Sequence, residues 1–223
     1  MTADGVAGRA FALDLPHGRA VAVAIGEAGD VDDAGDASPA AERAAAARYG
    51  DRRAREYLAG RRALRAALAD LGVGPIDAIA ADDRGAPRLP PTVVGSISHK
   101  GSLAIAVAAP AEGWTLGIDL EARAPRRVDI SRRVLTPAEA AAVAHLDADG
   151  RARAVLRTFS IKEAVYKAID PYLRRYVGFL EVEVHQRDGG VVVVAPDAWG
   201  LTIAAACQAH DDHWIATARA RRR

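Results

Sequence analysis

Cysteine, lysine and long apolar runs are all scarce in this chain of 223 residues. The single cysteine, Cys207, cannot form an internal disulfide, and the N-terminal residues do not resemble a signal peptide. The longest apolar stretches, such as VVVVAP and LTIAAAC, are far shorter than the roughly 20 residues that a membrane-spanning helix needs. We therefore expect a cytoplasmic protein with no membrane span.

The chain also lacks an excess of charge of either sign. It carries 30 Lys and Arg against 29 Asp and Glu, a net charge of +1. This balance argues against a general nucleic-acid binder. Only three of the basic residues are lysines, Lys100, Lys162 and Lys167, and the last two lie in the stretch FSIKEAVYKAID at 159–170. Either chance placed them there, or a site in this stretch needs ammonium groups rather than guanidinium groups.

Two similar blocks of about 110 residues follow one another, each reading as a strand, a helix and then antiparallel-looking strands. We predict an α+β fold of two similar halves, 1–113 and 114–223, packed with pseudo-twofold symmetry, with a site at their seam. The expected loop is 26–38, and a helix from Ser38 and Pro39 to Leu71 is expected to break near Gly50 or Gly60. Further helices are expected at 136–146 and 151–170, and strands at 19–25, 76–82, 93–99, 102–109, 114–122, 178–186, 191–195, 201–209 and 213–219.

On a helix, the stretch 159–170 has an apolar face and a polar face. Glu163 and Lys167 share the polar face, while Lys162 lies on the flank. An ordinary interpretation is an i,i+4 ion pair that contributes about 0.3–0.5 kcal/mol on an exposed helix. Taken alone, the stretch favours that interpretation over a functional site.

Two further motifs change the balance. In GIDLE, at 117–121, Asp119 and Glu121 alternate along a predicted strand, so both carboxylates project from one face. Two like charges held together suit a hard cation such as Mg²⁺, although a solvated strand edge is the alternative. In SISHK, at 96–100, His99 and Lys100 at a strand end either bind an anion or cap a hairpin. A fourth polar run, His210 to His213, is interpreted as a hairpin turn rather than a metal cluster.

Together, GIDLE, SISHK and FSIKEAVYK resemble the signature of the 4′-phosphopantetheinyl transferases, in the monomeric, two-halved type. The similarity extends to the stretches 60–68, 85–90 and 174–184, and so covers roughly residues 50 to 185. The turn GAPRLP departs from the family pattern, with Leu89 where a tryptophan is common. Lys100 falls at a position that the family varies, so its role is open.

The resemblance implies transfer of the 4′-phosphopantetheine arm of coenzyme A to a serine of an apo acyl or peptidyl carrier protein. It implies Mg²⁺ held by Asp119, Glu121 and Glu163, and catalysis by Glu163, Lys167 and Asp119, with either Glu163 or a metal-bound water as the base. Carriers of polyketide, nonribosomal peptide or siderophore assembly would be the partners. The residues implied to bind coenzyme A are Arg53, Arg61, Arg65, Ser98, His99, Lys162 and Lys167.

Three alternatives stay open at this point. The arginines of 53–65 equally fit a solvated helix face. A catalytically silent protein of the same fold could bind coenzyme A or a carrier without transfer. A different metal-assisted enzyme acting on phosphate esters, such as a hydrolase, fits the combined spacing poorly.

Overall fold

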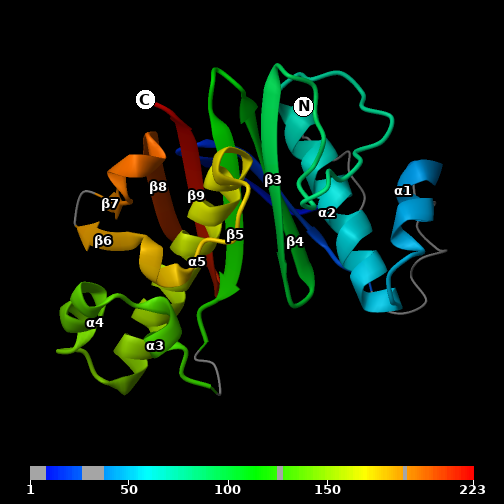
Figure 1. Ribbon diagram of the computed structural model, residues 1–223. Helices are drawn as coiled ribbons and strands as arrows, with labels where there is room; N and C mark the ends of the chain where they lie inside the picture. The colour runs from blue at the N-terminus through cyan, green and yellow to red at the C-terminus, as the bar shows by residue number, and fades with distance from the viewer. Residues whose placement is uncertain (1–8, 27–37, 125–127, 188–189) are drawn as a thin grey trace. The chain divides into compact units, whose positions relative to one another are not determined.

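The computed structural model describes residues 9–26, 38–124, 128–187 and 190–223. The chain divides into two compact units between Glu112 and Gly113. Each unit joins one antiparallel sheet to one long helix (Figure 1). The α+β class is therefore confirmed, whereas the pseudo-twofold packing of the two halves stays a prediction.

The first unit holds a four-stranded sheet in the order β1-β2-β4-β3. The long helix α2 packs against β2, β3 and β4 with its buried face of alanine and leucine. The predicted break in the helical region falls at Gly50, which stands at the N-terminal cap of α2. The elements are β1 (Arg9–Leu15), β2 (Gly18–Ala24), α1 (Ala40–Ala46), α2 (Asp51–Asp70), β3 (Val93–Lys100) and β4 (Leu103–Pro110).

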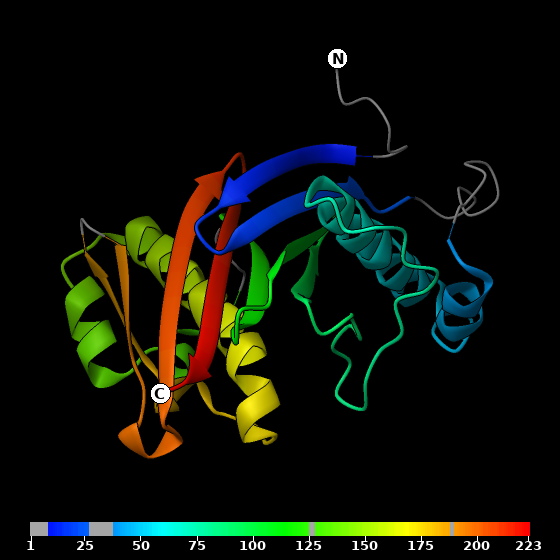
Figure 2. The same cartoon turned by 90° about the horizontal axis from the view of Figure 1, so that it is seen from above.

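The second unit holds a five-stranded sheet in the order β5-β9-β8-β7-β6. Figure 2 shows the long hairpin of β8 and β9 in this sheet, with the helix α5 on one face. The elements are β5 (Thr115–Ala122), α3 (Ser131–Val134), α4 (Pro137–Val143), α5 (Ala148–Leu173), the 3-10 turn η1 (Phe179–Glu181), β6 (Glu183–Arg187), β7 (Gly190–Val194), η2 (Asp197–Trp199), β8 (Leu201–His210) and β9 (His213–Arg222).

Small side chains let α5 lie close to this sheet. Its apolar face, which includes Ile161, Ala164 and Ala168, packs on a row of β9 alanines at 216, 218 and 220. Alanine removes most of the side-chain height between the two layers, so the helix and sheet backbones approach each other. The helix ends at Leu173, where Arg174 takes a left-handed conformation with φ 48°.

Three sequence expectations differ from the structure. Residues 76–82 form no strand apart from one bridge, Ala81 to Pro87, because the backbone N–H of Ile79 donates to the buried Glu42 carboxylate at 2.7 Å. The stretch 178–186 begins as η1, and only its second part is strand. The hairpin of β1 and β2 adds a strand, Arg9–Leu15, that was not predicted.

Other expectations hold or fall outside the described part. His210 and His213 pair across the turn between β8 and β9, which confirms the hairpin. Most of the expected loop at 26–38 lies outside the described residues. None of the helices in the described ranges is both long and apolar enough to cross a membrane.

Candidate active site

The site in the second unit begins with the alternation of β5. Gly117, Asp119 and Glu121 share one face of the strand, and Gly117 faces α5, because a Cβ added there would lie 2.0 Å from the carbonyl oxygen of Ala164. Thr115, on the same face, donates its hydroxyl to the carbonyl of Ala168 at 2.5 Å. The two carboxylates of GIDLE therefore point toward the side of the sheet that α5 covers.

Both carboxylates are buried, with Asp119 7% and Glu121 3% exposed. The Nζ atom of Lys167 donates to the carbonyl of Ile118 at 2.6 Å and lies 3.3 Å from Oδ1 of Asp119. Glu121 accepts the backbone N–H of Ala122 at 2.9 Å. An ammonium group thus neutralises part of the negative charge that the strand places here. The structure thus places Lys167 beside Asp119, two of the residues for which the resemblance implies a catalytic role.

Glu163 lies one helical turn before Lys167 on α5. Burial raises the pKa of the nearby Tyr166 hydroxyl, and the charge of Glu163 adds to that shift. The Tyr166 hydroxyl donates to the carbonyl of Gly178 at 2.9 Å. On α5, Glu163 lies between two sides of the helix. One side faces β5 through Ala164 and Ala168, and the other contacts residues 178–179 through Tyr166.

The chemistry of these donors suits Mg²⁺. Carboxylate oxygens are the ligands that this ion prefers, and burial makes a compensating cation favourable. Within the described ranges, however, no group of three or more His, Cys, Asp or Glu side chains lies close enough together to hold a metal ion. The metal set of Asp119, Glu121 and Glu163 stays a prediction.

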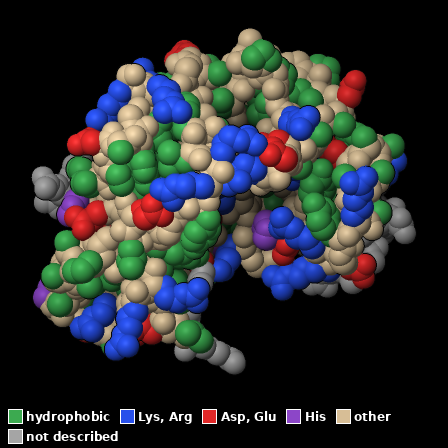
Figure 3. Space-filling model, viewed as in Figure 1, with side chains coloured by type: hydrophobic (Ala, Val, Ile, Leu, Met, Phe, Trp, Pro, Cys, Tyr) green, Lys and Arg blue, Asp and Glu red, His purple; other side chains and the backbone are tan. Residues whose placement is uncertain are grey.

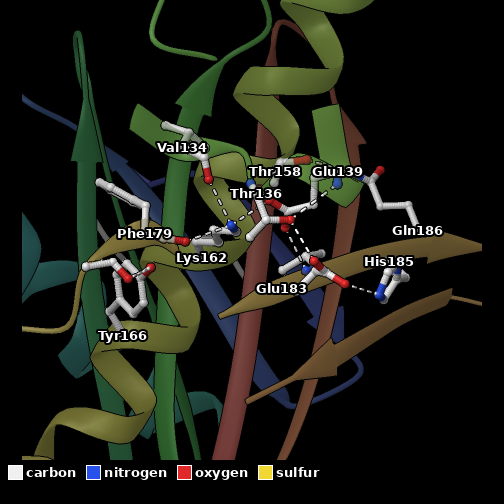
Figure 4. Close-up of polar contacts among 12 residues, drawn as sticks. Val134, Thr136, Glu139, Thr158, Lys162, Tyr166, Phe179, Glu183, His185 and Gln186 are labelled. Carbon is white, nitrogen blue, oxygen red and sulfur yellow. Dashed lines mark hydrogen bonds and ion pairs between the residues drawn. The ribbon is translucent and has the colours of Figure 1, made fainter. Parts of the chain in front are cut away.

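Lys162 is placed differently from the expectation that it binds coenzyme A. Its side chain is fully buried, and Nζ donates to the carbonyls of Val134 and Phe179, both at 2.8 Å, and to Oε2 of Glu139 at 2.7 Å (Figure 4). An ammonium group has three N–H donors, and three protein oxygens accept from it here. Because no donor is left for a phosphate, the structure argues against this role.

The first unit carries a second polar cluster, at the end of β3. Nη1 of Arg53 lies 2.5 Å from Nε2 of His99, and Oε2 of Glu56 lies 3.5 Å from the same ring nitrogen. Burial alone would raise the pKa of Glu56, but the charge of His99 and the hydrogen bonds from Arg53 and Arg52 lower it. Arg53 and His99 are both solvent-accessible, with 54% and 34% of their side chains exposed. This pair can meet an anion.

Ser98 and His99 of SISHK are neighbours on β3, so their side chains project from opposite faces of the strand. Ile97 and His99 face α2, since the Cβ that Gly60 lacks would lie 2.6 Å from Cγ2 of Ile97. Ser98 is 7% exposed and projects from the other face of the strand. Its side chain therefore does not join the Arg53–His99 cluster.

Arg61 and Arg65 make contacts within the first unit. The Arg61 guanidinium is 3.7 Å from the Tyr57 ring centroid, and burial lowers its pKa. Arg65 lies 2.5 Å from Oε1 of Glu42, which is 1% exposed. These contacts favour a structural role for both arginines over the predicted phosphate contact.

On the molecular face in Figure 3, basic and acidic side chains are interspersed.

Sequence reasoning did not identify the two buried carboxylates, Glu42 and Glu139, that hold Arg65 and Lys162. A signal for Glu139 was present, because Thr136-Pro137-Ala138-Glu139 has the pattern of a capping box with proline at the first helical position. A capping glutamate is usually solvated, so the pattern alone did not show that its carboxylate also binds a lysine.

Two family models match the chain. Residues 115–218 match the 4′-phosphopantetheinyl transferase superfamily, and residues 41–109 match the 4′-phosphopantetheinyl transferase N-terminal domain. The first match covers β5 and α5, and the second covers α2, β3 and most of β4. Both polar clusters therefore lie in matched segments.

Curated relatives agree with these matches. The chain is 36% identical over 135 residues to 4′-phosphopantetheinyl transferase Npt of Nocardia iowensis, covering 60% of each protein. It is 36% identical over 165 residues to 4′-phosphopantetheinyl transferase Svp of Streptomyces mobaraensis, covering 72% of this chain and 63% of that one. The chain thus spans less than two thirds of the length of these relatives. Among solved structures, the Chronobacterium ammoniagenes ACPS–CoA complex is 19% identical with a TM-score of 0.42, covering 50% of this chain and 99% of that one.

Proposed function

Because the chain belongs to the 4′-phosphopantetheinyl transferase superfamily, we propose that it transfers the 4′-phosphopantetheine arm of coenzyme A to a serine of an apo carrier protein. The serine oxygen forms a bond to the β-phosphorus, the phosphorus atom that bears the pantetheine arm. The bond from that phosphorus to the bridging oxygen of the pyrophosphate breaks, and adenosine 3′,5′-bisphosphate leaves. The observation that carries this proposal is the buried pair of carboxylates on β5 beside Lys167 of α5.

Phosphoryl transfer asks a protein mainly for positioning and for neutralisation of charge. Asp119, Glu121 and Glu163 would hold Mg²⁺, which supplies positive charge to the pyrophosphate oxygens when it is bound. Lys167 has a mobile ammonium, 31% exposed, that can exchange its contact with Asp119 for a phosphate oxygen. Glu163 is the proposed acceptor of the serine proton.

The first unit contributes anion contacts to this proposal. Arg53 and His99 are the two residues of the predicted coenzyme A set that the structure brings together at an accessible surface. A guanidinium beside an imidazole offers several N–H donors to a phosphate. We assign Arg53 and His99 to the phosphates of coenzyme A. In this proposal residues 1–113 form the half that binds the nucleotide, and residues 114–223 form the catalytic half.

The partner in this proposal is an apo acyl or peptidyl carrier protein, and the enzyme acts as a monomer in the cytoplasm. The sequence contains a single cysteine, Cys207, and so has no internal disulfide, which suits a reducing compartment. Carriers of polyketide, nonribosomal peptide and siderophore assembly are the class to test.

The deciding experiment incubates the protein with coenzyme A, Mg²⁺ and a panel of apo carriers, and weighs each carrier by mass spectrometry. We expect a mass gain equal to one phosphopantetheine arm, lost when EDTA replaces Mg²⁺. If coenzyme A binds but no carrier in the panel gains mass, the transferase proposal fails, and a silent binding protein of the same fold replaces it. Release of phosphate or of free phosphopantetheine without a carrier would instead favour a hydrolase.

A further inference from the structure

An ion pair to a buried carboxylate holds the long helix in each unit, and the two pairs connect equivalent elements. In each, a carboxylate from the short helix before the long helix accepts from a cation of the long helix and from a backbone N–H of the segment after it. The pairs are Glu42 with Arg65, and Glu139 with Lys162. The two cations occupy equivalent places, counted from the first residues of their helices, Asp51 and Ala148.

The pair in the second unit is the more fully bonded one. Both oxygens of Glu139 accept: Oε2 from Lys162 and from the N–H of Thr136, and Oε1 from the N–H of Val184, all at 2.7 Å. Lys162 in turn binds the last carbonyl of α3, at Val134, and the first carbonyl of η1, at Phe179. Five elements of the unit, α3, α4, α5, η1 and β6, therefore meet at one ammonium–carboxylate pair (Figure 4).

The position of Lys162 on α5 affects the direction in which the next residue, Glu163, points. Phe159, Lys162 and Tyr166 form one stripe of the helix, and all three contact residues 178–179. The opposite side, at Ala164 and Ala168, lies against β5 and β9. Glu163 and Lys167 form the stripe between these two contacts. The rotation of the helix about its axis, which decides where both side chains point, is thus set from two sides.

We propose that Lys162 is a positioning residue, whose ion pair with Glu139 fixes the rotation of α5 and so presents Glu163 and Lys167 to the carboxylates of β5. In this role the ammonium contacts neither coenzyme A nor the metal. The inference rests on the proposed function for the meaning of the Glu163 position. The bonding of the pair itself does not depend on that function.

The test compares the full-length wild-type protein with Lys162→Met, which keeps much of the side-chain volume but removes the charge. Hydrogen exchange is measured in peptides that cover 131–143 and 178–184, and coenzyme A binding is measured by calorimetry in EDTA. We expect exchange to speed up by about tenfold in both segments, which are far from residue 162 in sequence. The dissociation constant of coenzyme A in EDTA stays within about threefold of the wild-type value, because no phosphate contact is lost.

The kinetic part separates positioning from simple loss of stability. For Lys162→Met we expect kcat to fall by about 10²-fold and the Mg²⁺ concentration at half-maximal rate to rise, with KM for coenzyme A nearly unchanged. The control is Leu201→Ala, in the same core cluster but on β8 rather than on α5. It lowers Tm and leaves kcat and the Mg²⁺ requirement of the folded enzyme as in the wild type.

Two results would overturn the inference. A rise of about tenfold or more in the coenzyme A dissociation constant of Lys162→Met in EDTA, with unchanged exchange, would show a phosphate contact. Equal kinetic losses in Leu201→Ala would show that any destabilisation of the second unit suffices. If Lys162→Met does not fold, Glu139→Gln serves instead, because it keeps shape and removes the opposite charge; its exchange and kinetics must shift in the same direction. A wild-type protein that modifies no carrier would contradict the proposed function, while the exchange and EDTA measurements would still decide the role of Lys162.

Discussion

The long helices of the two units approach their sheets through different kinds of contact. In the first unit the nearest atoms to an added Cβ belong to side chains, Ile97 for Gly60 of the helix and Leu64 for Gly95 of β3. In the second unit the glycine is on the strand, and the Cβ that Gly117 lacks would meet the backbone of α5 at Ala164 and Ala168. A side chain can move and a helix backbone moves only as a whole, so the second contact is the stricter one. The stricter contact is also the one beside the proposed catalytic carboxylates.

The largest expected effect on the free energy of unfolding comes from replacing Gly117 or Gly60 with alanine. Gly117→Ala places a methyl group 2.0 Å from the Ala164 carbonyl oxygen, so α5 must shift or the unit must unfold. We expect a loss well above the roughly 1–3 kcal/mol of ordinary overpacking, up to complete unfolding of the unit, because the clash is with helix backbone. Gly60→Ala costs less, because Ile97 can change rotamer and alanine favours a helix over glycine by about 1 kcal/mol. Urea unfolding of both variants measures the difference, and equal losses would contradict the comparison.

The next effect distinguishes the two buried ion pairs. Glu139→Ala leaves the fully buried Lys162 ammonium without its counter-charge and removes the capping box of α4. We expect a loss of about 3–5 kcal/mol in the free energy of unfolding. Glu42→Ala is expected to cost less, because the Arg65 side chain is 21% exposed and water can solvate it. Thermal unfolding followed by circular dichroism gives the order, and a larger loss for Glu42→Ala would reverse our ranking.

A third comparison sets chemistry in the second unit against binding in the first. Asp119→Asn keeps the shape of the side chain but removes a charge from the proposed metal set, so kcat should fall by about 10²–10³-fold without loss of folding. Arg53→Ala should mainly raise KM for coenzyme A, since Arg53 is exposed and its contacts are with His99 and Glu56. Steady-state kinetics with a fixed carrier measure both. The assignment of the two units fails if Arg53→Ala lowers kcat as much as Asp119→Asn.

The smallest effect concerns Cys207 on β8. Burial raises the pKa of its thiol from 9.0 to about 11, although Arg157 acts in the opposite direction. Because the folded state holds this proton more tightly, its contribution to stability is present below about pH 9 and is lost as pH rises toward about 11. Alkylation with iodoacetamide should therefore remain slow in the native protein at pH 8 and 9 and become fast on unfolding. Cys207→Ala is the control, and fast native labelling at pH 8 would contradict the raised pKa.

Sequence alone predicted the elements whose pattern is local. The alternation of GIDLE placed Asp119 and Glu121 on one face of β5, and the helical spacing of Glu163 and Lys167 put them on one stripe of α5. It did not predict where Lys162 would point, since its partners Val134, Glu139 and Phe179 come from three separate segments. The expected strand at 76–82 failed for the same reason, because the backbone of Ile79 bonds to a side chain of a distant helix. Local periodicity is readable, whereas buried polar partners depend on the tertiary arrangement.

The absence of a side chain at Gly117 also determines how long a side chain of α5 must be to reach the carboxylates of β5. A glutamate has a shorter reach than a lysine, so Glu163 needs a helix that is seated deeply against its strand, while Lys167 tolerates more distance. If a methyl group raised the helix, the carboxylate would lose its reach before the ammonium did. Gly117, which faces α5 with no side chain, thus keeps the helix close enough to β5 for the Glu163 carboxylate to reach the carboxylates of the strand.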